Sequence, residues 1–176
     1  EFDLSADEKY YMFNGKRYDR VTGAVLPPPD DPDSFILQSG SSIGSKIDGI
    51  VRALILGEDV QFEDAVNRTD DGTNYVIETK EEFVAFKAEV KAWQESLEAN
   101  GDIIVAQPIK VWDDETMIAG EIDILIYNKN TNKYRLMDIK TRRRGGNTRT
   151  AITKDHKQKW SKQLSAYAIL IENSHG

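Results

Sequence analysis

The chain has 176 residues, a net charge of −7 and 39% hydrophobic residues, a composition typical of a folded globular protein and not of a disordered one. It contains no cysteine, which excludes disulfides, thiolate chemistry and cysteine-ligated iron–sulfur clusters, and its two histidines do not favour a histidine-rich zinc site. No apolar run approaches the length of a membrane span and no secretory signal is recognisable. We therefore expect an intracellular protein with no membrane partner, in a compartment that the sequence leaves open.

The N-terminal part of the chain carries a hairpin signal followed by a stiff connector. Residues 10–26 hold short strand-like runs on either side of Asn14-Gly15, a dipeptide typical of a tight β-turn. Residues 27–33 are rich in proline and aspartate, a composition that predicts an extended connector.

Two helices are expected in the middle of the chain. The first covers about 41–56, because its apolar residues recur every three or four positions. These apolar residues are Ile43, Ile47, Ile50, Val51 and Leu54. After an acidic, turn-rich segment at 58–75, the capping-box sequence at 79–82 starts a second helix, which ends at Asn100-Gly101.

The remaining elements are strands and a final helix. Strands are predicted at 103–112, 117–127 and 133–141, and a helix at 157–173. This order predicts an α/β fold with a central mixed β-sheet flanked by helices, in a single domain over 1–176. Within it, N-terminal strands and the connector occupy 1–40 and the main core occupies 41–176.

Two of the predicted strands bring three charged residues together. The polar turn at 128–133 joins them as a hairpin. Asp123 lies five residues before that turn and Asp138 five residues after it, so the two can be opposite one another in an antiparallel pair. Lys140 is two residues beyond Asp138 and shares its face.

Two carboxylates and a lysine in this arrangement are typical of metal-dependent phosphodiester cleavage. Mg²⁺ and Mn²⁺ prefer oxygen ligands, and a bound ion orients the scissile phosphate and makes bound water more acidic. A lysine beside them stabilises the charge that develops on the phosphate. An ordinary hairpin with solvated charges is the simpler alternative, since Asp-x-Lys alone is common. Against it, Asp123 interrupts a run that is otherwise apolar.

The chain resembles the PD-(D/E)xK nuclease superfamily, and within it the RecB-like exonuclease branch. Four short motifs occur in the order expected for that branch, and together they span most of the chain. They are Gly44-x-x-x-Asp48, Ala119-Gly120-x-Ile122-Asp123, Asp138-Ile139-Lys140-Thr141 and Gln163-x-x-x-Tyr167. Residues 11–22 also resemble the N-terminal strands of the branch.

The resemblance implies a restriction-endonuclease-like core and assigns roles to the matching residues. Asp123, Asp138 and Lys140 would be catalytic. One or two Mg²⁺ or Mn²⁺ ions would be held by Asp48, Asp123, Asp138 and the Ile139 backbone carbonyl. Gln163 and Tyr167 would help to place the strand that is cut, although burial of Tyr167 in the core explains that pair equally well.

Asp48 departs from the family pattern, which has histidine at this position. A carboxylate is a harder ligand than imidazole and would suit Mg²⁺. The same departure could mark a weakened or lost site, or a solvated residue at the edge of the apolar stripe.

A basic segment follows the proposed catalytic lysine. Residues 140–159 contain eight basic residues and one acid, although the whole chain is acidic. Such a segment could hold phosphates near the scissile bond, or it could be a solvated loop. The candidate substrate-binding residues in it are Arg142, Arg143 and Arg144.

These observations predict a Mg²⁺- or Mn²⁺-dependent deoxyribonuclease, first of all an exonuclease or flap-type enzyme acting on single-stranded ends. DNA is favoured over RNA by the resemblance and not by the residues. Two alternatives stay open: an RNA endonuclease on the same core, and a catalytically inactive module that binds nucleic acid or supports assembly.

Overall fold

The computed structural model describes residues 2–5, 9–26, 46–65, 77, 79–140, 144–145, 148–149 and 152–176.

The largest sheet has five strands and contains the predicted N-terminal hairpin. The sheet has the order β1 (Asp3–Leu4), β2 (Tyr10–Phe13), β3 (Lys16–Arg20), β6 (Ile118–Ile122) and β5 (Ile109–Asp113). Neighbours are antiparallel except β3 and β6, which are parallel. Asn14 and Gly15 form the β2–β3 turn with φ angles of 50° and 73°, as the Asn-Gly signal predicted.

The remaining described strands form two smaller sheets. β4 (Asp102–Ala106), β7 (Ile124–Asn128) and β8 (Lys133–Met137) form an antiparallel sheet in the order β4-β7-β8. β9 (Arg144–Gly145) and β10 (Thr148–Arg149) form a two-stranded ribbon.

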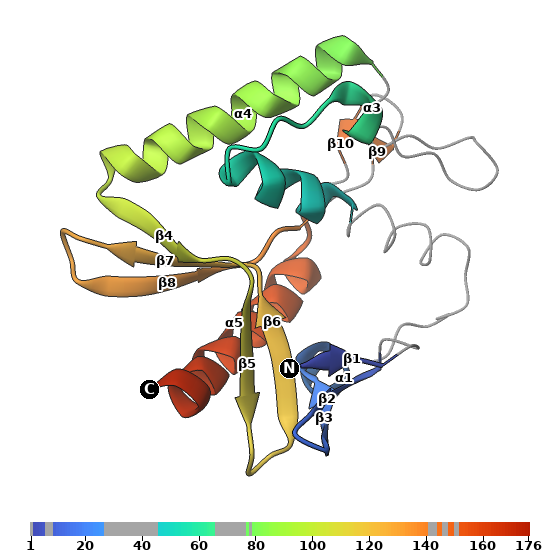
Figure 1. Ribbon diagram of the computed structural model, residues 1–176, viewed down its shortest axis with the longest axis vertical. Coiled ribbons are helices and arrows are strands. Elements are labelled where there is room, and N and C mark those ends of the chain that lie inside the picture. The colour runs from blue at the N-terminus through green and yellow to red at the C-terminus, as the bar shows by residue number, and fades with distance from the viewer. Residues whose placement is uncertain are drawn as a thin grey trace.

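The helices lie on both sides of these sheets (Figure 1). They are α1 (Val21–Val25), a helix at 46–55, α3 (Phe62–Ala65), α4 (Lys80–Ala99) and α5 (Lys154–His175). Thr79 caps α4 by accepting a hydrogen bond from the Glu82 N–H at 3.1 Å, and Asn100 ends it, so both predicted ends are confirmed. In the described part of the chain, no helix combines the length and the apolar character needed to cross a membrane.

The predicted long strands are each divided in two, which is the main correction to the expected fold. The strand predicted at 103–112 is broken at Gln107-Pro108, and the one predicted at 117–127 is broken at Asp123. Proline has no N–H to donate to a strand ladder, which accounts for the first break. In both cases one half belongs to the five-stranded sheet and the other half to the three-stranded sheet. The β-structure therefore curls where these two strands are broken. The third predicted strand ends at Met137 and not at residue 141.

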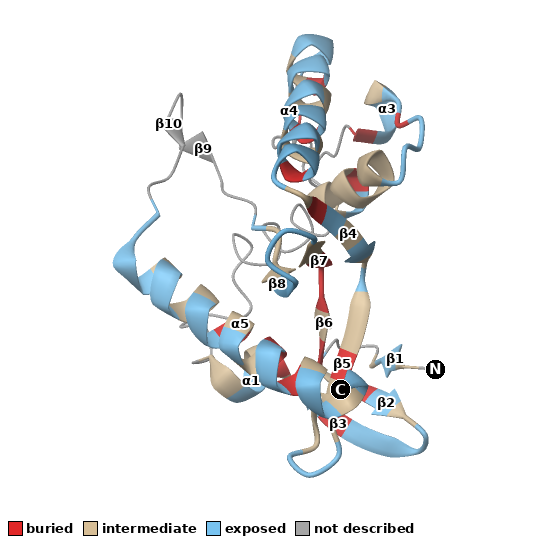
Figure 2. Ribbon diagram, turned by 90° about the vertical axis from the view of Figure 1, so that its left-hand side faces the viewer, coloured by how far each residue is buried: buried red, intermediate tan, exposed pale blue. Residues whose placement is uncertain are grey.

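Asp123 lies between two separate cores because of this curl. Ile122 packs with Val111 and Tyr167 beneath α5. Ile124 packs with Leu97 beneath α4. A straight strand would place both isoleucines on one face, because residues two apart in a strand share a face, but the break sends them into different cores. Figure 2 shows the buried strand β6 continuing toward β7 between the helices. The molecule is thus one small mixed α/β domain; the predicted division at residue 40 lies outside the described residues.

Gly120 is required by the packing of Tyr167 against β6. A Cβ atom at this position would lie 2.4 Å from Cε1 of Tyr167 and 3.1 Å from Cγ2 of Val21. The Tyr167 side chain is only 5% exposed and has little room to move. The glycine in the Ala119-Gly120 motif therefore allows the α5 tyrosine to lie on the strand backbone.

Replacing Gly120 with alanine is expected to destabilise the fold by about 1–3 kcal/mol, because the new methyl group overpacks the Tyr167 contact. Urea unfolding followed by circular dichroism measures this change. Gly23→Ala is the matched control, since its Cβ would have no heavy atom within 4 Å. Equal stability of the two variants would contradict the packing argument.

Candidate functional site

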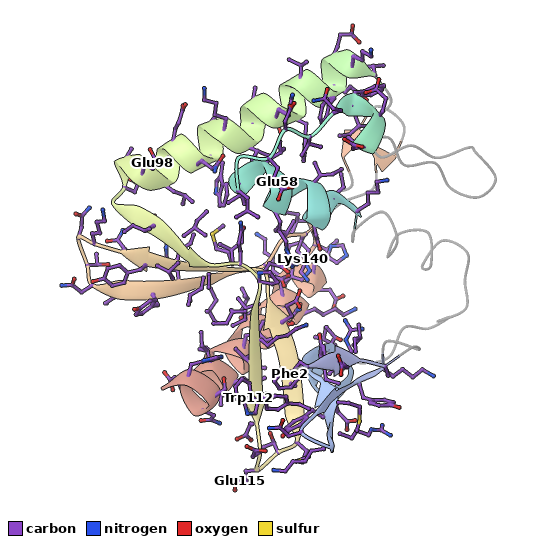
Figure 3. All side chains as sticks on the ribbon, viewed as in Figure 1. Phe2, Glu58, Glu98, Trp112, Glu115 and Lys140 are labelled. Atoms are coloured by element: carbon purple, nitrogen blue, oxygen red, sulfur yellow. The ribbon has the colours of Figure 1, made fainter. Side chains whose placement is uncertain are left out.

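The candidate site lies where the strand break, the end of β8, the helix at 46–55 and α5 come together. Lys140, just beyond β8, lies near the centre of the molecule at this junction (Figure 3). Helix 46–55 contributes Asp48 and α5 contributes Gln163, so residues far apart in sequence converge on one place.

Asp123 and Asp138 are in register, as the hairpin geometry predicted. The last pair of the β7–β8 ladder is Ile124 with Met137, so the next positions along the same register are Asp123 and Asp138. Neither lies inside a strand, because the ladder ends one step earlier. The two side chains are largely buried, with exposed fractions of 12% and 10%.

Both oxygens of the Asp123 carboxylate accept hydrogen bonds. The backbone N–H of Ile139 donates to Oδ2 at 2.7 Å, which ties the chain after β8 to the break between β6 and β7. The Arg52 guanidinium donates to Oδ1 through Nη2, also at 2.7 Å. Asp123 therefore links both strands to helix 46–55.

Lys140 is held by a short chain of polar side chains that ends in the core. Its ammonium lies 2.5 Å from Oδ2 of Asp138 and donates to Oε1 of Gln163 at 3.0 Å. Gln163, which is buried, donates in turn to the Tyr167 hydroxyl at 3.2 Å. Burial raises the pKa of Tyr167 to about 12, so the phenol stays neutral and accepts this hydrogen bond. The expected grouping of Lys140 with Asp138, Gln163 and Tyr167 is present.

Asp48 carries a carboxyl group whose ionised form is disfavoured. Burial, and then the negative charge of Asp123, raise its pKa to about 6, while Arg52 acts in the opposite direction. Its Oδ1 atom is buried with no hydrogen-bond partner. The Asp48 side chain thus lies near the carboxylates of Asp123 and Asp138. It is not a fully solvated residue at the edge of the apolar stripe, which was one of the alternatives from the sequence.

Asp138 is in a similar environment. Burial raises the pKa of Asp138, the ion pair with Lys140 opposes that shift, and the nearby Asp123 adds to it. Three acidic side chains therefore sit close enough to feel one another, in surroundings that make their negative charges costly.

Arg52 and Lys110 are charged residues of this junction that the sequence reasoning missed. Arg52 bridges Asp123 and Glu121, with Nη1 3.2 Å from Oε1 of Glu121. Lys110, on β5, forms an ion pair with the other oxygen of Glu121. The signal for Arg52 was its position four residues after Asp48, which places both on one helix face. Glu121 and Asp123 therefore point toward the same guanidinium.

Some predicted residues cannot be placed. Arg142 and Arg143 lie outside the described residues, and of Arg144 only the backbone is described, in β9. Their binding to phosphates of the substrate stays a prediction. So does the Ile139 carbonyl as a ligand, although the Ile139 N–H has a defined partner in Asp123.

The donor set suits Mg²⁺ or Mn²⁺ in chemistry but is not assembled around one point. Asp48, Asp123 and Asp138 supply only oxygen donors, and the buried Oδ1 atom of Asp48 lacks a hydrogen-bond partner. Yet within the described ranges no three histidine or acidic side chains group closely enough to hold an ion. Arg52 and Lys140 supply the positive charge at the carboxylates instead.

Two hollows flank this region. One of about 250 Å³ is lined by Asp138 and Ile139 together with apolar side chains of α4, including Trp93. A larger one of about 730 Å³ runs along β4 and touches none of the predicted site residues. Of these two hollows, the smaller one is the one lined by predicted site residues.

No family model, no curated protein and no solved structure matches this chain. The functional argument therefore depends on the residues of the site and their geometry.

Asp48→Asn is expected to stabilise the metal-free protein at pH 8 by about 1–2 kcal/mol, a value reduced for the partial exposure of the side chain. The folded-state pKa of about 6 exceeds the ordinary value of 3.8, so wild-type stability falls as the pH rises from about 4 to about 6. The variant escapes this loss, and its advantage should vanish toward pH 4. Urea unfolding in EDTA across this pH range measures it.

Asp114→Asn is a control of opposite sign. Hydrogen bonds from Lys16 and Tyr18 lower the pKa of Asp114, so its charged form stabilises the fold above the ordinary pKa and this contribution is lost in acid. Asp114→Asn should therefore be less stable than wild type at pH 8. If Asp48→Asn showed no gain at pH 8, the burial of a charged Asp48 would be wrong.

Proposed function

We propose that this protein is a divalent-metal-dependent nuclease that hydrolyses phosphodiester bonds of DNA, on a core of the restriction-endonuclease type. The observation that carries the proposal is the meeting of Asp123, Asp138 and Lys140 at one junction, with Asp48 facing them from a separate helix. Buried carboxylates without full hydrogen bonding cost stability, and such a cost is typical of functional sites.

Asp48, Asp123 and Asp138 would hold Mg²⁺ or Mn²⁺, which supplies charge neutralisation at the phosphate and a more acidic bound water. The raised pKa values of Asp48 and Asp138 fit this role, because carboxylates that repel one another in the free protein gain most from a cation.

Lys140 would act on the scissile phosphate. Its ammonium can donate to a non-bridging phosphate oxygen and stabilise the negative charge of the pentavalent transition state. Gln163 fixes the position of the ammonium, and its hydrogen bond to the buried Tyr167 limits its movement. Gln163 and Tyr167 are thus positioning residues, a more specific role than general placement of the strand.

DNA is the proposed substrate because of the resemblance to RecB-like exonucleases, which also favours action on single-stranded ends. The described residues contain no feature that selects deoxyribose, so matched DNA and RNA strands belong in the same assay.

A second candidate is a catalytically inactive nucleic-acid-binding module. The observation that favours it is the ion pair of Arg52 with Asp123, because a site whose carboxylates are neutralised by its own arginine and lysine needs no metal. Absence of Mn²⁺ binding in calorimetry would favour this candidate.

Cleavage of end-labelled single- and double-stranded DNA, with Mg²⁺, Mn²⁺ or EDTA, tests the proposal. Lys140→Ala and Asp138→Asn should each reduce cleavage at least ~100-fold. The first removes the positive charge that acts on the phosphate in the transition state, and the second removes a charged ligand of the metal. The cleavage ladder separates exonuclease from endonuclease action.

Lys133→Ala is the matched control, since Lys133 is exposed at the far end of β8 and should leave the rate unchanged. Metal-independent cutting, or cutting that survives both substitutions in the site, would contradict the nuclease proposal.

A further inference from the structure

Arg52 is hydrogen-bonded to Asp123, one of the carboxylates that would bind the metal ion. Its guanidinium spans Asp123 and Glu121, at 2.7 Å and 3.2 Å. The Arg52 side chain is 23% exposed, so it borders solvent on one side. Its Nε atom is buried and has no hydrogen-bond partner, which leaves one donor of the planar guanidinium unused.

The two hydrogen bonds of Asp123 differ in how readily they can be given up. The Ile139 N–H belongs to the backbone two residues beyond the end of the β7–β8 ladder. Arg52 reaches Asp123 through a long side chain with several rotatable bonds. Each Asp123 oxygen keeps a second lone pair, so an arriving cation is opposed by the positive charge of Arg52 and not by a lack of acceptor sites. Of the two donors, the charged side chain yields more easily than the neutral backbone N–H.

Charge leads to the same conclusion. The guanidinium contacts the carboxylates of Asp123 and Glu121, and Asp48 lies one helical turn before Arg52 on the same helix. A divalent ion placed among these carboxylates would repel a guanidinium on the same oxygen. The released arginine would carry a planar set of donors into solvent at the edge of the site, where a phosphate of the substrate would lie.

We propose that Arg52 is a displaceable resident cation: it holds Asp123 while the site is free of metal, gives up this carboxylate to a divalent ion, and then binds a phosphate of the nucleic acid. This inference rests on the proposed function. It gives Arg52 two successive partners of the same charge, first a carboxylate and then a phosphate, so that metal and substrate cooperate through one side chain.

Calorimetric titration with Mn²⁺ alone, on the whole chain, tests the first step. Arg52→Gln removes the competitor and should bind Mn²⁺ about tenfold more tightly than wild type. Arg52→Lys should also bind more tightly, by a smaller factor, because one ammonium cannot bridge both carboxylates; it carries the test if the glutamine variant does not fold. Arg17→Gln, at an exposed ion pair with Asp19, is the control and should match wild type.

Binding of a single-stranded DNA oligonucleotide tests the second step, with Ca²⁺ as the metal so that binding is measured without cleavage. Arg52→Gln should bind more weakly, with a salt dependence whose slope is smaller by about one. Arg17→Gln should leave both quantities unchanged.

The outcomes separate this inference from the function on which it rests. If wild type binds Mn²⁺ and cuts DNA but Arg52→Gln binds Mn²⁺ no more tightly, the displacement is wrong and the nuclease stands. If the DNA affinity of Arg52→Gln equals that of wild type, the phosphate role is wrong. If wild type neither binds Mn²⁺ nor cuts DNA, the proposed function fails, and the role of Arg52 fails with it.

Discussion

The Asp123 carboxylate is the interaction on which the rest of the structure depends. It lies at the break between β6 and β7, where Ile122 enters one core and Ile124 another. One of its oxygens receives the N–H of Ile139 and the other the guanidinium of Arg52. A single side chain therefore joins the break in the sheet to the chain after β8 and to helix 46–55.

The same interaction brings the candidate site together. Because the chain after β8 is tied to Asp123, Asp138 and Lys140 face the α5 residue Gln163. Because Arg52 is tied to Asp123, Asp48, one helical turn earlier, faces the same carboxylates. The acids are then close and poorly solvated, which raises the pKa values of Asp48 and Asp138 and disfavours their charged forms.

The sequence predicted the local elements and the main contacts of the site well. The Asn14-Gly15 turn, the Thr79 cap and the Asp123–Asp138 register follow from local rules, and the structure has all three. The division of two long strands was missed, because apolar periodicity does not reveal where a sheet curls and only Pro108 gave a local signal. Arg52 was missed because the helix spacing places it only on the same face as Asp48. Its contact with Asp123 joins residues 71 positions apart in sequence, which helix spacing does not predict. The arginine side chains of the basic segment lie outside the described residues, while its lysines at 154, 157 and 159 belong to α5.

Anomalous diffraction from crystals soaked in Mn²⁺ tests the central claim most directly, namely that the carboxylates around Asp123 form a metal site. The account predicts a manganese peak bonded to Asp123 and Asp138, with Asp48 beside it and the Arg52 side chain turned away from Asp123. Manganese bound elsewhere, or no peak with Arg52 still on Asp123 at saturating Mn²⁺, would contradict it.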